Sequence, residues 1–455
     1  MAAPIATRSA EPIPPLRIAV VGAGPGGLAT AIHLLRLKDV ELSVFDQARE
    51  LREVGAGISL NENTWRLLQD LGAADKLEQF VKRGANGKIA MEHRNGRTGA
   101  LLSRAYHSGD PDKPPAVRVE RYKLQNALLS QVPPGLIQLS KKLAAVQEST
   151  NGVTLEFADG TKAGPFDLVV GADGIRSVVR QHAFPTHKLK YTGKVAYRVL
   201  FPQEKIAHLL PSIPPASCFW HTRANYIYTN VLDNGLFEIA TRANEPEEHG
   251  NKVSWGQVVP KEQVVHHYQH FSPLLREIIE VPDSWLEFAM FGGPRLESII
   301  HNDRIVLVGD ASHPLSGAFG SGAAFAFEDA YALKASIDFA RRYGQDLGYA
   351  LRLFDSFRAP RYKDLYGVLD EMAANTEGVK AENPDIDDDA FVEKTTERNW
   401  EQAQERKFIY SYNIAQVWAQ REAEEEAKLA AEGRKLVPDA AAPAPPAAAP
   451  IPAVA

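Results

Sequence analysis

Cysteine is nearly absent from this 455-residue chain, which contains only Cys218. A single cysteine excludes an internal disulfide and any metal site built from several thiolates. A free cysteine usually behaves as a small buried hydrophobic residue, and we expect that role for Cys218. Such sparing use of cysteine fits a reducing compartment, so we expect a cytoplasmic protein.

The chain also lacks a long hydrophobic run and a large excess of one charge. No apolar stretch approaches the ~20 residues that a membrane-spanning helix needs, so no membrane partner is expected. Residues 1–15 contain no apolar core of the signal-peptide type, and we expect a disordered leader there. The 51 basic and 57 acidic residues give a net charge of −6, which argues against a nucleic-acid partner.

Glycine is present in a specific pattern near the N-terminus. The segment RIAVVGAGPGGLATAIHLL reads as a short buried strand, then Gly22, Gly24 and Gly27 in the spacing G-x-G-x-x-G, then a helix. Gly22 permits a tight turn, Gly24 lets the backbone approach a pyrophosphate, and Gly27 lets the helix pack closely on the strand. The start of the helix supplies N–H groups for the anion.

A carboxylate for the ribose is expected about 20 residues later, at the end of the next strand. The segment ELSVFDQA supplies Asp46 at such a position. Its oxygens would accept hydrogen bonds from ribose hydroxyls. Together the two motifs predict an adenine dinucleotide, but they do not separate FAD from NAD.

Two later segments resolve that ambiguity by resemblance. DLVVGADGIRSVVR, which contains Asp173, and VLVGDASHP, which contains Asp310, are similar to the Asp-Gly and Gly-Asp fingerprints of the flavoprotein aromatic hydroxylases. The segments LREVGAGISL and VRVERYKLQNAL also look like segments of that family, and the three fingerprints follow in the family's order. The chain resembles the salicylate-hydroxylase group of these FAD-dependent monooxygenases most.

The resemblance implies FAD as cofactor and NADH or NADPH as co-substrate. It implies that Asp310 contacts the ribityl chain, that Arg121 lies near the phosphates, and that Asp173 lies near the pyrophosphate. Small residues after Asp310 would let the backbone approach the flavin ring. The cofactor-binding residues are therefore expected to be Gly22, Gly24, Gly27, Asp46, Ala56, Arg121, Asp173, Asp310, Gly320, Gly322 and Ala323.

Residues 190–240 show a different pattern, because apolar and polar side chains alternate through KVAYRVLF, YIYTNVL and GLFEIATRA. Period-two alternation predicts an antiparallel sheet, which in the family forms a wall of the substrate cavity. Arg198 and Tyr228 are the expected substrate contacts, the first for an anionic group. Tyr226 lies two positions away on the same face and is not distinguished from Tyr228. The histidines of HHYQHF, residues 266–271, are interpreted as a helix surface, and no metal site is expected.

The predicted fold is α/β, with a Rossmann-like FAD-binding domain, an inserted antiparallel β-sheet substrate domain and a helical C-terminal region. The first domain is expected at 16–185 together with 295–375, and the second at 186–294. The helical region is expected at 376–436, followed by a disordered Ala/Pro tail at 437–455.

The resemblance implies hydroxylation of a salicylate-like phenolic acid by O2 through a flavin C4a-hydroperoxide, with decarboxylation left open. One alternative is a fungal tailoring monooxygenase that hydroxylates or dearomatises a polyketide phenol. Alternatives of other classes are a flavin-bearing regulatory protein without turnover and a flavin reductase or dehydrogenase. The expected partners are a small aromatic substrate, O2 and NAD(P)H, in a monomer or a homodimer.

Overall fold

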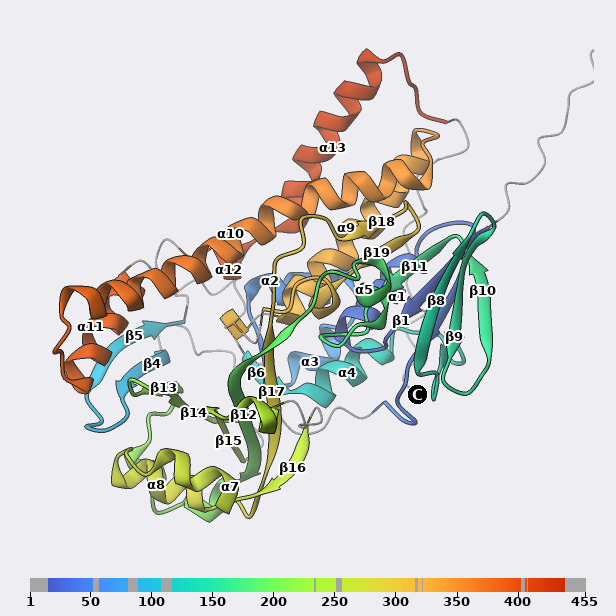
Figure 1. Ribbon diagram of the computed structural model, residues 1–455. Helices are drawn as coiled ribbons and strands as arrows, with labels where there is room; N and C mark the ends of the chain where they lie inside the picture. The colour runs from blue at the N-terminus through green and yellow to red at the C-terminus, as the bar shows by residue number, and fades with distance from the viewer. Residues whose placement is uncertain are drawn as a thin grey trace, which may run out of the picture.

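The structure is a computed structural model in which two lobes lie side by side along one long helix (Figure 1). It describes residues 15–51, 57–80, 89–107, 117–232, 235–250, 256–315, 318–320, 322–401, 406 and 408–437. The predicted leader and tail therefore lie almost entirely outside the described residues. The α/β class expected from the sequence is confirmed.

The first lobe is built on a six-stranded sheet in the order β18-β19-β11-β1-β2-β7. All neighbours pair in parallel except β18 and β19. Apolar residues fill the central strand, and Ile18, Ala19 and Val20 are fully buried, as expected for a parallel strand covered on both faces. The strands are Leu16–Val21 (β1), Val40–Phe45 (β2), Ile137–Gln138 (β7), Leu168–Gly171 (β11), Ile300–His301 (β18) and Ile305–Leu307 (β19).

Two helices far apart in the sequence pack closely in this lobe. Helix α1 (Pro25–Leu34) follows β1, and α9 (Gly322–Arg342) lies against it. A Cβ atom at Gly26 would stand 3.0 Å from the Cβ of Ala326, so only small residues allow this approach. Also in this lobe are α2 (Glu62–Asp70), α3 (Asp75–Glu78), α4 (Arg121–Leu129), α5 (Val178–Ala183), the pair β3 (Gly57–Leu60) and β6 (Val117–Glu120), and the three-stranded sheet β8 (Leu143–Ser149), β9 (Gly152–Phe157) and β10 (Lys162–Phe166).

The second lobe is an eight-stranded sheet in the order β16-β17-β12-β15-β14-β13-β4-β5. Its pairs are antiparallel except β13 and β4. The sequence had assigned residues 89–106 to the first domain, but they form two strands of this sheet. The strands are Ile89–Asn95 (β4), Leu101–Tyr106 (β5), Lys190–Pro202 (β12), Ser217–His221 (β13), Tyr226–Val231 (β14), Leu236–Asn244 (β15), Gln257–Pro260 (β16) and Ser284–Gly292 (β17).

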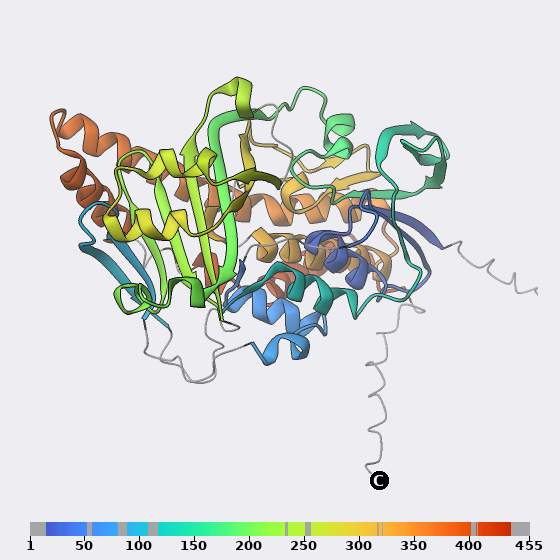
Figure 2. The same ribbon diagram turned by 90° about the horizontal axis from the view of Figure 1, so that it is seen from below.

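The two faces of this sheet differ in character. The outer face carries Tyr197, Trp220, Ile227 and Phe237, which join a buried apolar core with α7 (Glu262–Val265) and α8 (Pro273–Glu280). Figure 2 shows these helices lying across the sheet. The alternate residues, among them Arg198, point to the inner face, toward the first lobe. The lobe thus buries one face for stability and presents polar and aromatic side chains on the other.

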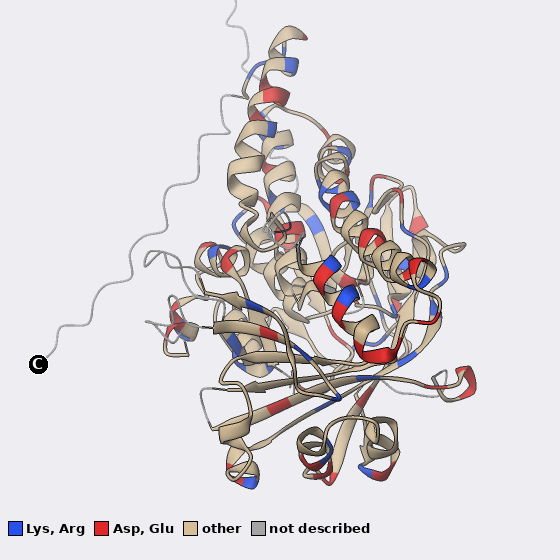
Figure 3. Ribbon diagram, turned by 90° about the vertical axis from the view of Figure 1, so that its left-hand side faces the viewer, with Lys and Arg blue, Asp and Glu red and all other residues tan. Residues whose placement is uncertain are grey.

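The C-terminal helices connect the two lobes. Helix α10 (Leu347–Glu382) packs on α9 at one end and on α11 (Asp388–Glu401) at the other, and α11 contacts β4 and β5 (Figure 1). Two further helices, α12 (Phe408–Ser411) and α13 (Ile414–Ala431), complete the described chain. Acidic and basic residues are interspersed along these helices (Figure 3). Among the described helices, none combines the length and apolarity needed to cross a bilayer.

Candidate active site

The glycine motif lies between β1 and α1, and its three glycines meet different surroundings. Gly22 has φ +102°, and a Cβ there would lie 2.4 Å from the carbonyl oxygen of Ala172. A Cβ at Gly27 would lie 1.8 Å from the carbonyl oxygen of Gly22. A Cβ at Gly24 would meet nothing within 4 Å. Gly22 and Gly27 are therefore required by the fold, whereas Gly24 borders open space in front of the α1 N-terminus, where a phosphate fits.

Asp46 lies directly after β2, beside this loop. Its Oδ2 accepts a hydrogen bond from the backbone N–H of Ala23 (2.6 Å), and its Oδ1 accepts one from Ala48 (2.8 Å). These bonds fix the carboxylate at the carboxyl end of the parallel strands, where nucleotides bind in open α/β sheets. Each oxygen keeps a lone pair for a ribose hydroxyl.

Asp173 has a different environment from the one expected for a group facing the pyrophosphate. Its carboxylate accepts hydrogen bonds from the N–H of Val178 (2.7 Å) and from the Ser177 hydroxyl, so it caps helix α5. Burial raises its pKa. Its backbone, however, lies against the glycine loop, since a Cβ at Gly22 would stand 3.1 Å from the Cα of Asp173. A direct cofactor contact of Asp173 stays a prediction.

Asp310 follows β19 in the turn η4 (Gly309–Ala311). Its side chain is accessible to solvent, yet surrounding protein raises its pKa by burial, against the opposing effects of Arg121 and Arg180. The carboxyl is therefore open to solvent although protein atoms surround it on several sides, so it lies on a concave part of the surface, called the recess below. Arg180 also donates to the carbonyl of Ala311 (2.8 Å), which joins the two later fingerprints. No sequence motif indicates that role of Arg180.

Gly320, Gly322 and Ala323 lie where η5 (Ala318–Gly320) leads into α9. Gly320 has φ +62°, and a Cβ at Gly322 would meet nothing within 4 Å. The backbone here is therefore open to a planar ring, with the N-terminus of α9 behind it. Ala56, the remaining predicted cofactor residue, lies outside the described residues.

Three arginines gather where the cofactor lobe meets the inner face of the eight-stranded sheet. Arg118 lies on β6, Arg121 begins α4, and Arg198 lies on β12. Burial lowers the pKa of Arg198, and the charges of Arg118 and Arg121 lower it further, although Glu238 opposes them. Since Arg121 acts on both Asp310 and Arg198, the predicted cofactor and substrate residues border one recess.

One of these arginines is neutralised by a buried carboxylate. Arg118 donates from Nη2 to Oε1 of Glu238 (2.7 Å) and from Nε to its other oxygen, and Glu238 also accepts from the N–H of Gly57 (2.8 Å). Arg118 further donates to Ser59 Oγ (2.9 Å). Glu238 is fully buried, and Arg118 holds its pKa below the usual range although burial acts to raise it. This ion pair, which sequence analysis missed, joins the cofactor lobe to β15.

Arg198 has no such partner. Within the described part of the chain no carboxylate forms an ion pair with it, and its guanidinium lies 5.6 Å from the ring centre of Phe288. A half-buried cation that forms no ion pair among the described residues produces a positive potential around its guanidinium. That site favours an anionic ligand.

Tyr228 lies on the same inner face as Arg198, with Ala240 of β15 between them, because Arg198 pairs with Ala240 and Ala240 pairs with Tyr228. Its ring lies 4.9 Å under the guanidinium of Arg118, and its hydroxyl is 3.0 Å from Ser217 Oγ. Burial raises its pKa to about 12, so the phenol is neutral at physiological pH. Tyr226 is on the same face but lies under Arg242 instead. Of these two tyrosines, Tyr228 is the one whose ring stacks with Arg118.

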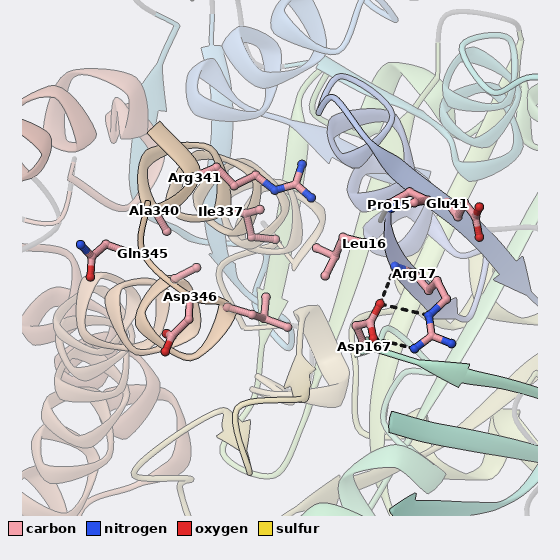
Figure 4. A pocket seen from close by; sticks show the side chains of 12 residues that line it. Pro15, Leu16, Arg17, Glu41, Asp167, Ile337, Ala340, Arg341, Gln345 and Asp346 are labelled. Carbon is pink, nitrogen blue, oxygen red and sulfur yellow. Dashed lines mark hydrogen bonds and ion pairs between the residues drawn. The ribbon is translucent and has the colours of Figure 1, made fainter. Parts of the chain in front are cut away.

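A separate cavity lies at the opposite edge of the parallel sheet. It has a volume of about 640 Å³ and is lined by Leu16, Arg17 and Asp167 on one side and Ile337 and Arg341 on the other. Arg17 and Asp167 form an ion pair of 2.7 Å in its wall (Figure 4). This is the amino end of β1, whereas the predicted cofactor residues lie at the carboxyl end. The cavity is therefore not part of the site described above.

Comparison with known proteins agrees with this geometry. Residues 16–342 match the FAD binding domain family. The 3-amino-4-hydroxybenzoate 2-monooxygenase PtmB3 of Streptomyces platensis is 31% identical over 357 residues, which are 77% of this chain and 86% of that protein. Salicylate hydroxylase of Pseudomonas putida is 25% identical over 400 residues, covering 81% and 90%. A solved salicylate hydroxylase substrate complex shares the fold, with a TM-score of 0.70 at 22% identity over 90% of this chain and 98% of that one.

Proposed function

Because this chain belongs to the family of FAD-dependent aromatic monooxygenases, we propose that it hydroxylates a phenolic aromatic acid and that Arg198 binds the anionic group of that substrate. The single observation that carries the proposal is the position of Arg198. It is a half-buried arginine on the wall of the recess, without a carboxylate partner among the described residues. The relatives named above act on hydroxybenzoates, which carry a carboxylate and a phenol.

The residues present fit FAD. Gly24 leaves room for the pyrophosphate at the start of α1, Asp46 faces the ribose position, and Asp310 lies in the recess with Arg121 nearby. When bound, FAD supplies the redox chemistry that activates O2, with NADH or NADPH as the source of electrons.

The recess would assist hydroxylation through its charge. An aromatic ring is a better nucleophile when its phenol is ionised, and a positive potential lowers the pKa of a bound phenol. Arg198 supplies that potential, because Glu238 neutralises Arg118 but no described carboxylate neutralises Arg198. Tyr228, neutral and held by Ser217, is placed to hydrogen-bond the substrate.

We predict that Arg198→Gln raises the KM for a hydroxybenzoate, because a charge-assisted hydrogen bond of about 1.5–3 kcal/mol is lost, equivalent to ~10–100-fold. Arg198→Lys should recover part of that loss. The measurement is NADH and NADPH oxidation under air with salicylate and with 3-amino-4-hydroxybenzoate, followed by mass analysis of the products. Formation of catechol from salicylate would identify decarboxylation.

The matched control is Arg276→Gln, because Arg276 is exposed on α8, beyond the outer face of the sheet. It should leave KM unchanged. Equal turnover of phenols with and without a carboxylate, unaffected by Arg198→Gln, would contradict the proposal and favour a larger neutral phenol such as a polyketide.

A further inference from the structure

We propose that Glu245, His266 and His267 form a binding site for a divalent transition-metal ion, with Zn²⁺ as the expected ligand, at the end of β15 farthest from the recess. Glu245 follows β15, and the two histidines lie where α7 continues into η3 (His266–Tyr268). One imidazole nitrogen from each histidine and one oxygen of the carboxylate lie within 4.8 Å of one another.

The ligand atoms converge from two separate elements. His267 Nε2 lies 2.8 Å from Glu245 Oε1, and the rings of His266 and His267 are 3.9 Å apart at their centres. Zinc binds imidazole nitrogen at about 2.0–2.1 Å and carboxylate oxygen at about 2.0–2.2 Å. Ligands of one ion stand about 3 Å apart at such bond lengths, so the pair of His267 and Glu245 already has ligand spacing, and a rotation of the exposed His266 side chain would complete the set. The fourth position stays open to water.

Neighbouring groups hold the ligands in orientation, as metal sites require. The hydroxyl of Tyr197 donates to Glu245 Oε1 (3.2 Å), and the hydroxyl of Tyr191 donates to the backbone carbonyl of Glu245 (3.2 Å). His266 uses Nδ1 for the backbone carbonyl of Glu262 (3.3 Å), which leaves Nε2 for the metal. Glu245 and His266 are therefore positioned by hydrogen bonds outside the set, and the ring of His267 stacks with that of Tyr197 at 6.0 Å between ring centres.

The charge around the site also suits a cation. Glu287 is fully buried nearby, and its Oε1 is 2.7 Å from His249 Nε2. Its other oxygen has no hydrogen-bond partner among the residues that the structure describes. The negative charges of Glu245 and Glu287 both act on His267, and in partly buried surroundings such charges favour a cation more strongly than they would in water.

The sequence did not predict this site, because its carboxylate, Glu245, lies on another element, 21 residues before His266 in the chain. Folding brings Glu245 to the two histidines from the end of a strand. The ion would link β15 to the α7–η3 segment, on the side of the sheet away from the flavin residues. We therefore expect it to stabilise the sheet rather than to take part in oxygen transfer.

The test uses the full-length, untagged, FAD-loaded protein after treatment with a chelator. Zn²⁺ is titrated by calorimetry, and Co²⁺ replaces it for a visible spectrum of the coordination. We expect one ion per chain and a Zn²⁺-dependent rise in Tm. His266→Gln should weaken binding by about tenfold or more, and it should fold normally because His266 is exposed.

The matched control is His270→Gln in the same segment, because His270 contacts Thr222 and lies outside the ligand set. It should bind Zn²⁺ as the wild type does. The proposal is overturned if the wild type shows no saturable binding, or if His266→Gln and Glu245→Gln both bind as tightly as the wild type. Loss of binding only in His249→Gln would place the ion at Glu287 instead and would also overturn it.

Discussion

At the scale of single residues, Gly24 and Gly27 have different roles: we expect Gly24 to be needed for cofactor binding and Gly27 for folding. A side chain at Gly24 meets open space, whereas one at Gly27 meets the backbone of Gly22. We predict that Gly24→Val loses FAD but keeps the stability of the cofactor-free protein, since the new side chain occupies only the pyrophosphate position. Gly27→Val should destabilise the fold by about 3 kcal/mol through overpacking. Flavin absorbance of the purified proteins measures the loss of FAD, and urea unfolding of their cofactor-free forms measures the loss of stability. Equal losses of FAD and of stability in the two variants would contradict these separate roles.

His33 predicts a pH dependence of stability. It is buried in α1, its Nε2 has no hydrogen-bond partner, and burial lowers its pKa to about 3. The neighbouring carboxylate of Asp70 is already paired with Arg36. Since the unfolded chain takes up this proton near pH 6.5 and the folded chain does not, stability should fall as the pH decreases from about 6.5 toward 3.

Urea unfolding at pH 7.5 and pH 5.5 measures this effect. Between pH 7.5 and pH 5.5, the free energy of unfolding of His33→Asn should fall by about 1.4 kcal/mol less than that of the wild type. This difference corresponds to a tenfold change in the protonation of one group. The exposed pair of His208 and Glu277 provides a control, because His208→Gln removes no buried imidazole. A wild-type pH profile unchanged by His33→Asn would refute the assignment.

The sequence predicts a site residue when the elements that position it lie close to it in the chain. The glycines and Asp46 are recognisable because a strand, a turn and a helix within one short segment impose them. Arg118 and Glu238 are not, because their contact joins positions 120 residues apart. The only signal was a charged residue at position 238 of a strand whose neighbours, Phe237 and Ile239, are apolar.

At the scale of elements, buried charges hold α9 against the turn that contains Asp310. Asp329 accepts from the N–H of Gly309 (2.8 Å) and from Arg358 Nε (2.8 Å), and Glu328 accepts from Arg358 and Arg361 (3.1 Å each). All four side chains are almost fully buried. This cluster ties α9 to α10 and to the turn that contains Asp310.

We predict that Arg358→Leu destabilises the protein by about 3–5 kcal/mol, because it leaves two buried carboxylates undercompensated. Arg352→Leu on the same helix should cost less than about 1 kcal/mol, because its pair with Asp303 is exposed. Urea unfolding of both variants gives the comparison. Similar losses for the two would show that the buried cluster contributes no more than a surface ion pair.

The elements themselves were largely predictable. Alternation through residues 190–240 predicted strands, and β12, β14 and β15 are found there. The position of β4 and β5 was not predictable, because parallel pairing of β4 with β13 joins segments more than 100 residues apart, as Phe219 opposite His93 illustrates. Periodicity identifies a strand but not its partner.

At the scale of the whole molecule, the ion pair of Arg118 and Glu238 fixes the inner face of the eight-stranded sheet against the first lobe. We predict that Arg118→Met still oxidises NAD(P)H but that a larger share of this oxidation yields H2O2 instead of hydroxylated product. The reason is that the substrate and the flavin are no longer aligned and that water enters the site. Arg118→Lys should restore part of the coupling. The measurement is the ratio of hydroxylated product to NAD(P)H consumed, and a ratio unchanged in Arg118→Met would contradict the role.

The two faces of the eight-stranded sheet differ in the substitutions that they tolerate. Along each central strand, one set of alternate residues packs against α7 and α8, and the other set lines the recess. Substitutions at the recess positions leave the apolar core on the opposite side intact. Substrate preference is therefore open to mutation and selection at those alternate positions without a matching loss of stability, because the apolar core on the outer face maintains the fold.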